Sequence, residues 1–145
     1  MEPSSGPGSV VLLTRLARVV YRKSNEELLG IRLKNLMALA YLREHQDATQ
    51  QVFSEAMHLD ANNCVLLLNE LEGLGFATRQ RDPSDRRRHL LTITETGRAA
   101  LERAERAQET IEDDVLGALS PEERATLNDL LSRALDGTRT PTPTP

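Results

Sequence analysis

The stretch 60–93 most constrains how this chain can fold, because a helix pattern is followed there at once by a hairpin pattern. The helix pattern places apolar residues at three- and four-residue spacing, which predicts one buried helical stripe. The stripe consists of Cys64, Leu67, Leu68, Leu71 and Leu74. Asp60 stands where a helix N-cap is expected, and Gly75 stands where the helix should end. Strand patterns at 76–79 and 90–93 then flank the turn sequence at 82–85, whose proline and aspartates favour a tight turn.

The predicted hairpin is strongly basic near its tip. Residues 79–89 hold five arginines and one histidine against two aspartates. The arginines are Arg79, Arg81, Arg86, Arg87 and Arg88. A helix followed by a basic hairpin is the layout of a winged helix-turn-helix, whose helix enters the DNA major groove while its hairpin reaches the flanking backbone or minor groove. Such a run can also be a plain solvated loop, but the strand patterns on both sides favour the hairpin.

The charge of the whole chain is unevenly distributed. The formal net charge of −4 argues on its own against a nucleic-acid partner, but the distribution of charge is more informative than its sum. Residues 102–114 hold six acidic side chains against two arginines, so the acid is predicted to lie away from the basic hairpin. The 145 residues are the length of one domain, and 39% hydrophobic with 3% aromatic residues suits a small helical protein.

Two helices are predicted between residues 34 and 59. The first begins near Lys34 and carries a wide apolar stripe, which predicts a central, buried position. Its stripe consists of Leu36, Met37, Leu39, Ala40 and Leu42. Thr49 is the predicted N-cap of a second, short helix. The inward-facing residues of that helix are Val52, Phe53, Ala56 and Met57. A short helix, a tight turn and a longer helix have the spacing of a helix-turn-helix, with His58 at the turn position, which is usually glycine.

Amphipathic helices are predicted at both ends of the chain, and they could pack on their own domain or pair with a second copy. They span 10–29, 95–117 and 121–136. Thr94 is the expected cap of the second, while the run Ser120-Pro121-Glu122-Glu123 has the form of a capping box that starts the third. Residues 1–8, rich in Pro, Gly and Ser, and the Thr/Pro tail at 137–145 are expected to be disordered.

A family resemblance rests on the run LNELEGLGFATRQRDPSDRRRHLLTITETG. Its Asp-Pro-x-Asp-Arg-Arg motif, followed by Leu-Thr-x-Thr-x-x-Gly, strongly resembles the MarR (multiple antibiotic resistance regulator) family of dimeric bacterial transcription regulators. The resemblance covers roughly 9–136 and is strongest from 60 to 97. It implies a mainly α fold with a small β-hairpin wing. Its implied parts are dimerisation helices at about 9–29 and 95–136 and a DNA-binding lobe at about 33–93.

The first turns of the recognition helix hold the residues expected at the DNA bases. They are Ala61, Asn62, Asn63, Val65 and Leu66. Asn62 can bond an adenine edge in the major groove through two hydrogen bonds. Leu66 takes a place that relatives often fill with arginine, and contact with thymine methyl groups is one use for it. Two alternatives stay open, because Asn63 could serve only as a helix cap and Leu66 could belong to the core.

On the wing, the resemblance implies that Arg87 reaches into the minor groove. Asp85 stands two positions before it and would orient it through a charge-assisted hydrogen bond. Arg86 and Arg88 are expected at phosphates. Arg79 and Arg81, on the incoming strand, complete the set of predicted DNA-binding residues of the hairpin.

The resemblance also implies a small phenolic or other aromatic effector, bound between the dimer helices and the DNA-binding lobe. Tyr21, Met37 and Tyr41 could line such a pocket, although residues of these types more often belong to the core. Some relatives sense peroxides through a cysteine near the first helix. Cys64 falls instead on the inward stripe of the recognition helix, where a buried cysteine acts as a small apolar group.

Other functional classes find little support in the sequence. The three histidines are scattered without metal-ligand spacing, and no nucleophile elbow, phosphate loop or HExxH motif occurs, so we expect no metal, cofactor or catalytic residue. No apolar run is long enough for a membrane span, and the N-terminus lacks the pattern of a secretory signal. One cysteine excludes an intrachain disulfide framework. These features predict a cytoplasmic protein.

The sequence therefore predicts a homodimeric repressor that binds double-stranded DNA at a pseudo-palindromic operator and is released by a small ligand. The alternative is a winged-helix protein-interaction module, in which the basic hairpin docks an acidic protein partner without reading DNA.

Overall fold

The computed structural model describes residues 6–138, which fold into seven helices and three short strands. In chain order these are α1 (Ser9–Lys23), α2 (Glu26–Leu29), α3 (Leu33–Glu44), β1 (Ala48–Thr49), α4 (Gln50–Ala56), α5 (Ala61–Gly73), β2 (Ala77–Asp82), β3 (Asp85–Ile93), α6 (Glu95–Val115) and α7 (Pro121–Gly137). This is the mainly α architecture with a small β-hairpin that the sequence predicts. The disorder predicted for 1–8 and 137–145 falls largely outside the described residues.

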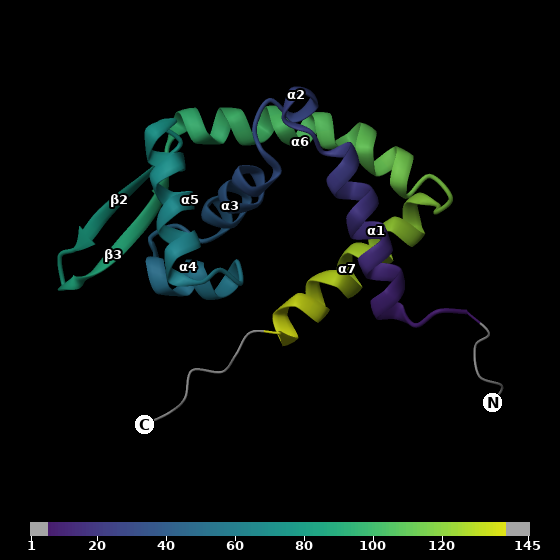
Figure 1. Ribbon diagram of the computed structural model, residues 1–145, viewed down its shortest axis with the longest axis horizontal. Helices are drawn as coiled ribbons and strands as arrows, with labels where there is room; N and C mark the ends of the chain where they lie inside the picture. Colours follow the sequence, from purple (N-terminus) through teal and green to yellow (C-terminus); the bar gives the residue numbers. More distant parts are fainter. Residues whose placement is uncertain (1–5, 139–145) are drawn as a thin grey trace.

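Helix α6 forms the long upper edge of the molecule and joins two parts that hang from its ends (Figure 1). At one end lie α3, α4, α5 and the three strands, which together we call the winged lobe, with the β2–β3 hairpin projecting from it. At the other end lie α1 and α7, which we call the terminal helices (Figure 1). None of the described helices is both long and apolar enough to cross a membrane.

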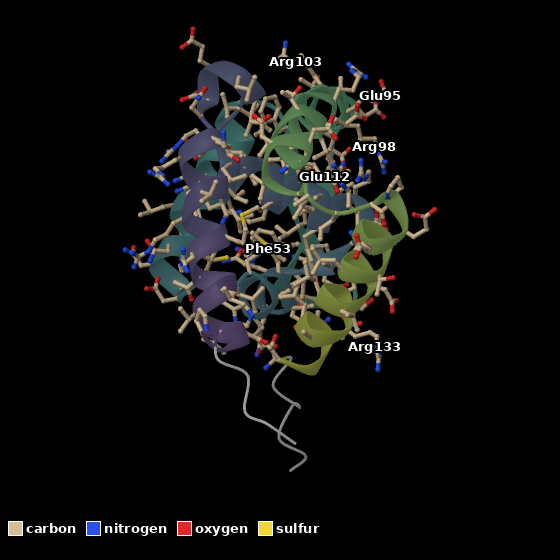
Figure 2. The ribbon with its side chains drawn as sticks, turned by 90° about the vertical axis from the view of Figure 1, so that its right-hand side faces the viewer. Phe53, Glu95, Arg98, Arg103, Glu112 and Arg133 are labelled. Atoms are coloured by element: carbon tan, nitrogen blue, oxygen red, sulfur yellow. The ribbon has the colours of Figure 1, made fainter. Side chains whose placement is uncertain are left out.

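The winged lobe encloses most of the hydrophobic core. Phe53 of α4 lies in the interior of the molecule, whereas Arg133 points outward from α7 (Figure 2). The largest fully buried apolar side chains around Phe53 are Leu39, Leu42, Leu68, Leu71, Leu91 and Cys64. The predicted stripe of α5 is therefore confirmed except for Leu74, which is exposed because α5 ends at Gly73 and Leu74 is its C-cap.

The helix starts predicted from the sequence are confirmed by their capping hydrogen bonds. Asp60 accepts the backbone N–H of Asn63 at 2.7 Å. Thr49 caps α4 in the same way, and Thr94 caps α6. Ser120 forms a complete capping box with Glu123 at the start of α7. These side chains satisfy N–H groups that have no partner within the helix, so local chemistry fixes where each helix begins.

The strands form one antiparallel sheet in the order β1-β3-β2. Pro83 and Ser84 connect β2 to β3, and Asp82 lies opposite Asp85. The second strand begins at Asp85, so the arginine run 86–88 is itself part of β3 and does not form a loose tip. The sequence did not predict β1, whose two residues pair with Leu90 and Leu91, because two residues are too few to show a strand pattern.

Several predictions about the helices were wrong. The helix predicted at 10–29 is interrupted, because the Asn25 side chain accepts the Leu28 N–H at 2.8 Å and starts a separate helix, α2. Val52 and Met37, predicted to face inward, are exposed. The polar residue Asn35 is buried in α3 instead. Hydrophobic spacing marks the centre of a buried face well, but it marks the edges of that face poorly.

Gly97 fixes how the hairpin meets α6. A Cβ atom at this position would collide with the backbone oxygen of Phe76, just before β2. Thr94 strengthens the same junction, since its hydroxyl donates to the Gly75 carbonyl at 2.6 Å and its backbone N–H donates to the Phe76 carbonyl at 2.9 Å. The first turn of α6 is thereby tied to the base of the hairpin.

Candidate nucleic-acid interface

Helices α4 and α5 form the predicted helix-turn-helix. His58 lies in the turn with φ 55°, the left-handed conformation that glycine adopts most easily. Ser54 of α4 supports the turn, because its hydroxyl donates to the Leu59 carbonyl at 2.8 Å while its own carbonyl accepts the Leu59 N–H at 3.0 Å. The geometry needed at the turn is therefore present although the sequence has no glycine there.

Helix α5 has one buried face and one outward face. The buried face is made by Cys64, Leu67, Leu68 and Leu71. The outward face is made by Asn62, Val65, Leu66 and Asn69, at the same helical spacing. Leu66 is 56% exposed and Val65 37% exposed, so the alternative that Leu66 belongs to the core is wrong.

The two asparagines that begin α5 have different surroundings. The Asn63 side-chain amide donates to the second carboxylate oxygen of Asp60 at 3.0 Å, while the first oxygen caps the Asn63 backbone. The Asn63 side chain is thus engaged at the helix start, in agreement with the alternative that Asn63 serves the helix cap. Asn62 and Ala61 are exposed, so both can be reached by a molecule lying against the outward face of α5.

At the hairpin, Arg87 and Asp85 form the predicted charge-assisted pair. Asp85 Oδ1 accepts the Arg87 backbone N–H at 3.1 Å and the Arg87 Nε–H at 3.2 Å. These bonds lower the pKa of the Asp85 carboxyl, the backbone bond first and the guanidinium bond second. The Arg87 side chain is nevertheless 91% exposed, so Asp85 binds the Nε edge of the guanidinium and leaves most of the side chain open to solvent.

Two other arginines near the hairpin tip, Arg81 and Arg88, also have a polar partner within the hairpin. Arg81 Nη1 donates to the Arg86 carbonyl across the hairpin at 3.0 Å. Arg88 Nε lies 4.0 Å from Asp82 Oδ2. The side chains of Arg81, Arg86 and Arg88 are exposed, so the tip presents an open cluster of positive charge. Asp82 and Asp85 orient that cluster from its base.

Arg79 has a different position from the other arginines. Its guanidinium lies 3.0 Å from Glu72 Oε1 and donates to Asn69 Oδ1 at 3.2 Å, and its side chain is only 24% exposed. Arg79 therefore holds β2 against α5, and its charge is balanced within the lobe. The sequence could not reveal this partner, because Glu72 looks like an ordinary solvated residue at the end of α5.

The second glutamate near the C-terminal end of α5, Glu70, also has basic partners. Glu70 lies 3.1 Å from Arg32 and 3.5 Å from Lys34, both at the start of α3. With Glu72 paired to Arg79, both carboxylates of α5 have basic partners. A polyanion approaching the outward face of α5 would therefore meet little net repulsion from the helix.

None of the three residues predicted to bind an effector lines the cavity between α1, α6 and α7. Tyr21 is exposed on α1, Met37 is exposed on α3, and Tyr41 is half-buried with its ring stacked on His45 at a centroid distance of 4.2 Å. A cavity of about 540 Å³ lies elsewhere, between α1, α6 and α7. Its walls include Leu16, Val20, Ile111, Leu127 and Leu131, together with Glu105, Gln108, Glu109 and Glu112. The sequence does not reveal this cavity, because three separate helices build it.

Cys64 has the surroundings of a structural residue. It is buried in the core of the lobe, and burial raises the pKa of its thiol. A raised pKa disfavours the thiolate, which is the reactive form of cysteine. Within residues 6–138, no cluster of His, Cys, Asp and Glu has the geometry to hold a metal ion.

Comparison with known proteins supports this arrangement. The model of the MarR family matches residues 31–89, which covers α3 through most of the hairpin. A Thauera aromatica protein, named as a provisional transcriptional regulatory protein for the hcr operon, is 36% identical over 95 residues. The uncharacterised HTH-type transcriptional regulator YdgJ of Bacillus subtilis is 30% identical over 104 residues. The matches take in 66% and 72% of this chain but only 57% and 63% of those curated relatives, less than two thirds of their length.

The whole fold also matches solved structures. The transcriptional repressor CouR, solved bound to a 23-mer DNA duplex, superposes with a TM-score of 0.74 at 27% identity. That match covers 92% of this chain and 99% of CouR, so the likeness extends beyond the winged lobe to the terminal helices.

Proposed function

We propose that this chain, a member of the MarR family, is a transcriptional regulator that binds double-stranded DNA as a homodimer and represses transcription. The observation that carries the proposal is the pairing of two features within the winged lobe. The outward face of α5 is exposed and free of net charge, and the hairpin beside it projects Arg87 with its guanidinium unburied. In a winged helix-turn-helix, the first feature suits a major groove and the second suits the flanking minor groove or backbone.

The residues proposed to contact DNA all have exposed side chains. Asn62, Val65 and Leu66 face the bases, with Ala61 beside them, and Asn63 supports the helix start. Arg87 enters the minor groove, where narrow A·T-rich segments attract arginine, and Arg81, Arg86 and Arg88 lie near phosphates. Arg79 is excluded from the contact set, because Glu72 and Asn69 engage its guanidinium.

Homodimer formation is supported by the terminal helices. No residue of α1 or α7 is buried within one chain, although both helices carry apolar faces. A second copy would cover these faces and place two winged lobes on one duplex. The likeness to CouR, named a transcriptional repressor, supports repression, and the likeness to a bacterial transcriptional regulator supports a location in the cytoplasm, where bacterial DNA lies.

Release by a small aromatic ligand is the regulatory part of the proposal. Tyr41 and Met37 lie on α3, the helix of the winged lobe that packs against α6, so a ligand near them could change how the lobe is held. Tyr21 lies exposed on α1, outside the winged lobe.

Selection of bound duplexes from a random library by the full-length protein tests the proposal. Two recognition helices related by two-fold symmetry should enrich a pseudo-palindrome whose half-site centres lie about 10 bp apart. Asn62→Ala should cost on the order of 1–3 kcal/mol at one base pair of the selected site and relax the preference there. Asn128→Ala, which removes an exposed amide from α7, is the matched control and should change nothing at that base pair.

A selection without a preferred sequence would contradict the proposal. If the selection enriches no sequence, and scrambled duplexes bind as well as any other, the chain does not read DNA. The basic hairpin would then serve as a docking surface for an acidic protein partner.

A further inference from the structure

The outward face of α5 contains no basic side chain. The helix reads ANNCVLLLNELEG, so its 13 residues hold two glutamates and no lysine or arginine. Its exposed middle is occupied by Val65 and Leu66, one turn beyond Asn62. A helix with this surface cannot donate charged hydrogen bonds to guanine, which is the commonest specific contact of arginine and lysine in the major groove.

The exposed pair Val65 and Leu66 leaves apolar surface in contact with water unless a partner covers it. Val65 and Leu66 are adjacent, and both are exposed while the opposite face of the same helix is fully packed. The C5 methyl of thymine is the apolar group that standard base pairs present in the major groove. Covering Leu66 with that methyl would remove apolar area from water on both molecules.

The charges around the face select DNA as its occupant. Glu70 and Glu72 are paired with Arg32, Lys34 and Arg79, so α5 itself contributes no net repulsion. The open arginine cluster at the hairpin tip belongs to the same lobe and is complementary to phosphates. An apolar protein partner would find the apolar pair but would have no use for the arginines.

We propose that α5 reads an A·T-rich half-site, in which Leu66 and Val65 contact thymine methyl groups and Asn62 bonds an adenine. This inference rests on the proposed function and adds the class of sequence that is bound. Asn62 and Leu66 are four residues apart, roughly 6 Å along a helix. Base pairs are stacked about 3.4 Å apart. The adenine and the thymine should therefore lie within two base-pair steps of each other.

The test uses the duplex selected from the random library, with each thymine of the half-sites replaced in turn by uracil. Uracil keeps the pairing edge and removes only the methyl group. Wild-type affinity should fall roughly fourfold per half-site at the thymine that Leu66 covers, as expected for one buried methyl. Leu66→Ala should bind the thymine duplex more weakly and should no longer distinguish thymine from uracil at that position.

Leu74→Ala is the matched control, because Leu74 is also exposed but lies at the C-terminal end of α5. It should keep the full preference for thymine. If Leu66→Ala fails to fold, the uracil series on the wild-type protein still decides the question.

Three results separate the two levels of the proposal. A selected half-site in which one uracil weakens binding supports the inference. A selected half-site that is G·C-rich, or in which no uracil weakens binding, overturns the inference and leaves the proposed function intact. A library that yields no preferred sequence overturns both.

Discussion

The winged lobe and the terminal helices both carry apolar faces but bury them to very different extents. In the lobe, Leu39, Phe53 and Leu71 are completely buried. In the terminal helices, Val10 is 76% exposed and Leu135 is 63% exposed, and no residue of either helix is buried. The core of the lobe is closed within one chain, with Leu101 and Ala104 of α6 completing it, whereas the terminal helices have apolar faces that need a second surface. The chain therefore carries one unit with a closed core and one unit that we propose is completed by another copy.

One ion pair connects the lobe to the long helix that leads to the terminal helices. Arg43 of α3 donates two hydrogen bonds to the carboxylate of Glu105 on α6. Nη1 bonds Oε1 at 2.5 Å, and Nη2 bonds Oε2 at 2.8 Å. Glu105 also lines the cavity between α1, α6 and α7. Glu105 therefore contacts the winged lobe through Arg43 and lies beside the terminal helices, so substituting it measures how strongly the lobe and the terminal helices are coupled.

The largest effect should come from removing α7, the residues Pro121–Gly137. If α7 completes the dimer, its loss should give monomers or insoluble protein. Affinity for the two-half-site operator should then fall by a factor of about 100 or more, because the second lobe no longer binds at high effective concentration. Light scattering and titration with the operator measure both effects. A folded monomer that retains wild-type affinity would show that the terminal helices do not assemble the DNA-binding form.

The next largest effect should come from the core of the lobe. Phe53→Ala should lower the free energy of unfolding by about 3–5 kcal/mol, because it removes a completely buried aromatic ring and leaves a cavity. Val52→Ala, at the neighbouring exposed position of α4, is the control and should change it by no more than about 0.5 kcal/mol. Urea denaturation at one fixed protein concentration gives both values. Equal effects of the two substitutions would contradict the assignment of the core.

A smaller effect on stability is expected from the Arg43–Glu105 ion pair between α3 and α6. The hydrogen bonds from Arg43 lower the pKa of Glu105, with burial opposing the shift. The folded pKa is therefore below the unfolded one, so the pair stabilises the fold above about pH 4.3 and loses this contribution as the pH falls through the folded pKa. Glu105→Gln should cost about 1 kcal/mol at pH 7, since both side chains are partly exposed.

Denaturation of Glu105→Gln and wild type across pH 3–7 checks this. The difference between them should shrink toward the acid end. A difference that stays constant across that range would mean that the ion pair contributes nothing. Glu109→Gln, at an exposed position of the same helix, is the matched control.

The sequence predicted those features that depend on a few neighbouring residues. The caps at Thr49, Asp60, Thr94 and Ser120 are local, because the capping oxygen and the N–H group it accepts are three residues apart. The Asp85–Arg87 pair was predictable for the same reason. The family resemblance supplied the order of the elements and the assignment of the hairpin as a wing.

The features that the sequence did not predict depend on which elements meet in space. The partner of Arg79 was not predicted, because Glu72, seven residues earlier in the chain, lies against it across the α5–β2 contact. The cavity between α1, α6 and α7 combines residues more than 100 positions apart in the sequence. The break at Asn25 was local and could have been predicted, since an asparagine followed by two glutamates is a helix-start pattern.

The central claim is that the winged lobe contacts DNA through its hairpin, and the salt dependence of binding by Arg87→Ala tests it most directly. We expect weaker binding to the selected operator and to scrambled duplexes alike, and a slope of log affinity against log salt that is smaller by about one. Arg106→Ala, at an exposed position of α6, changes the net charge equally and should leave the slope unchanged. If Arg87→Ala has wild-type affinity and the wild-type slope on every duplex, the hairpin is not a DNA-binding wing.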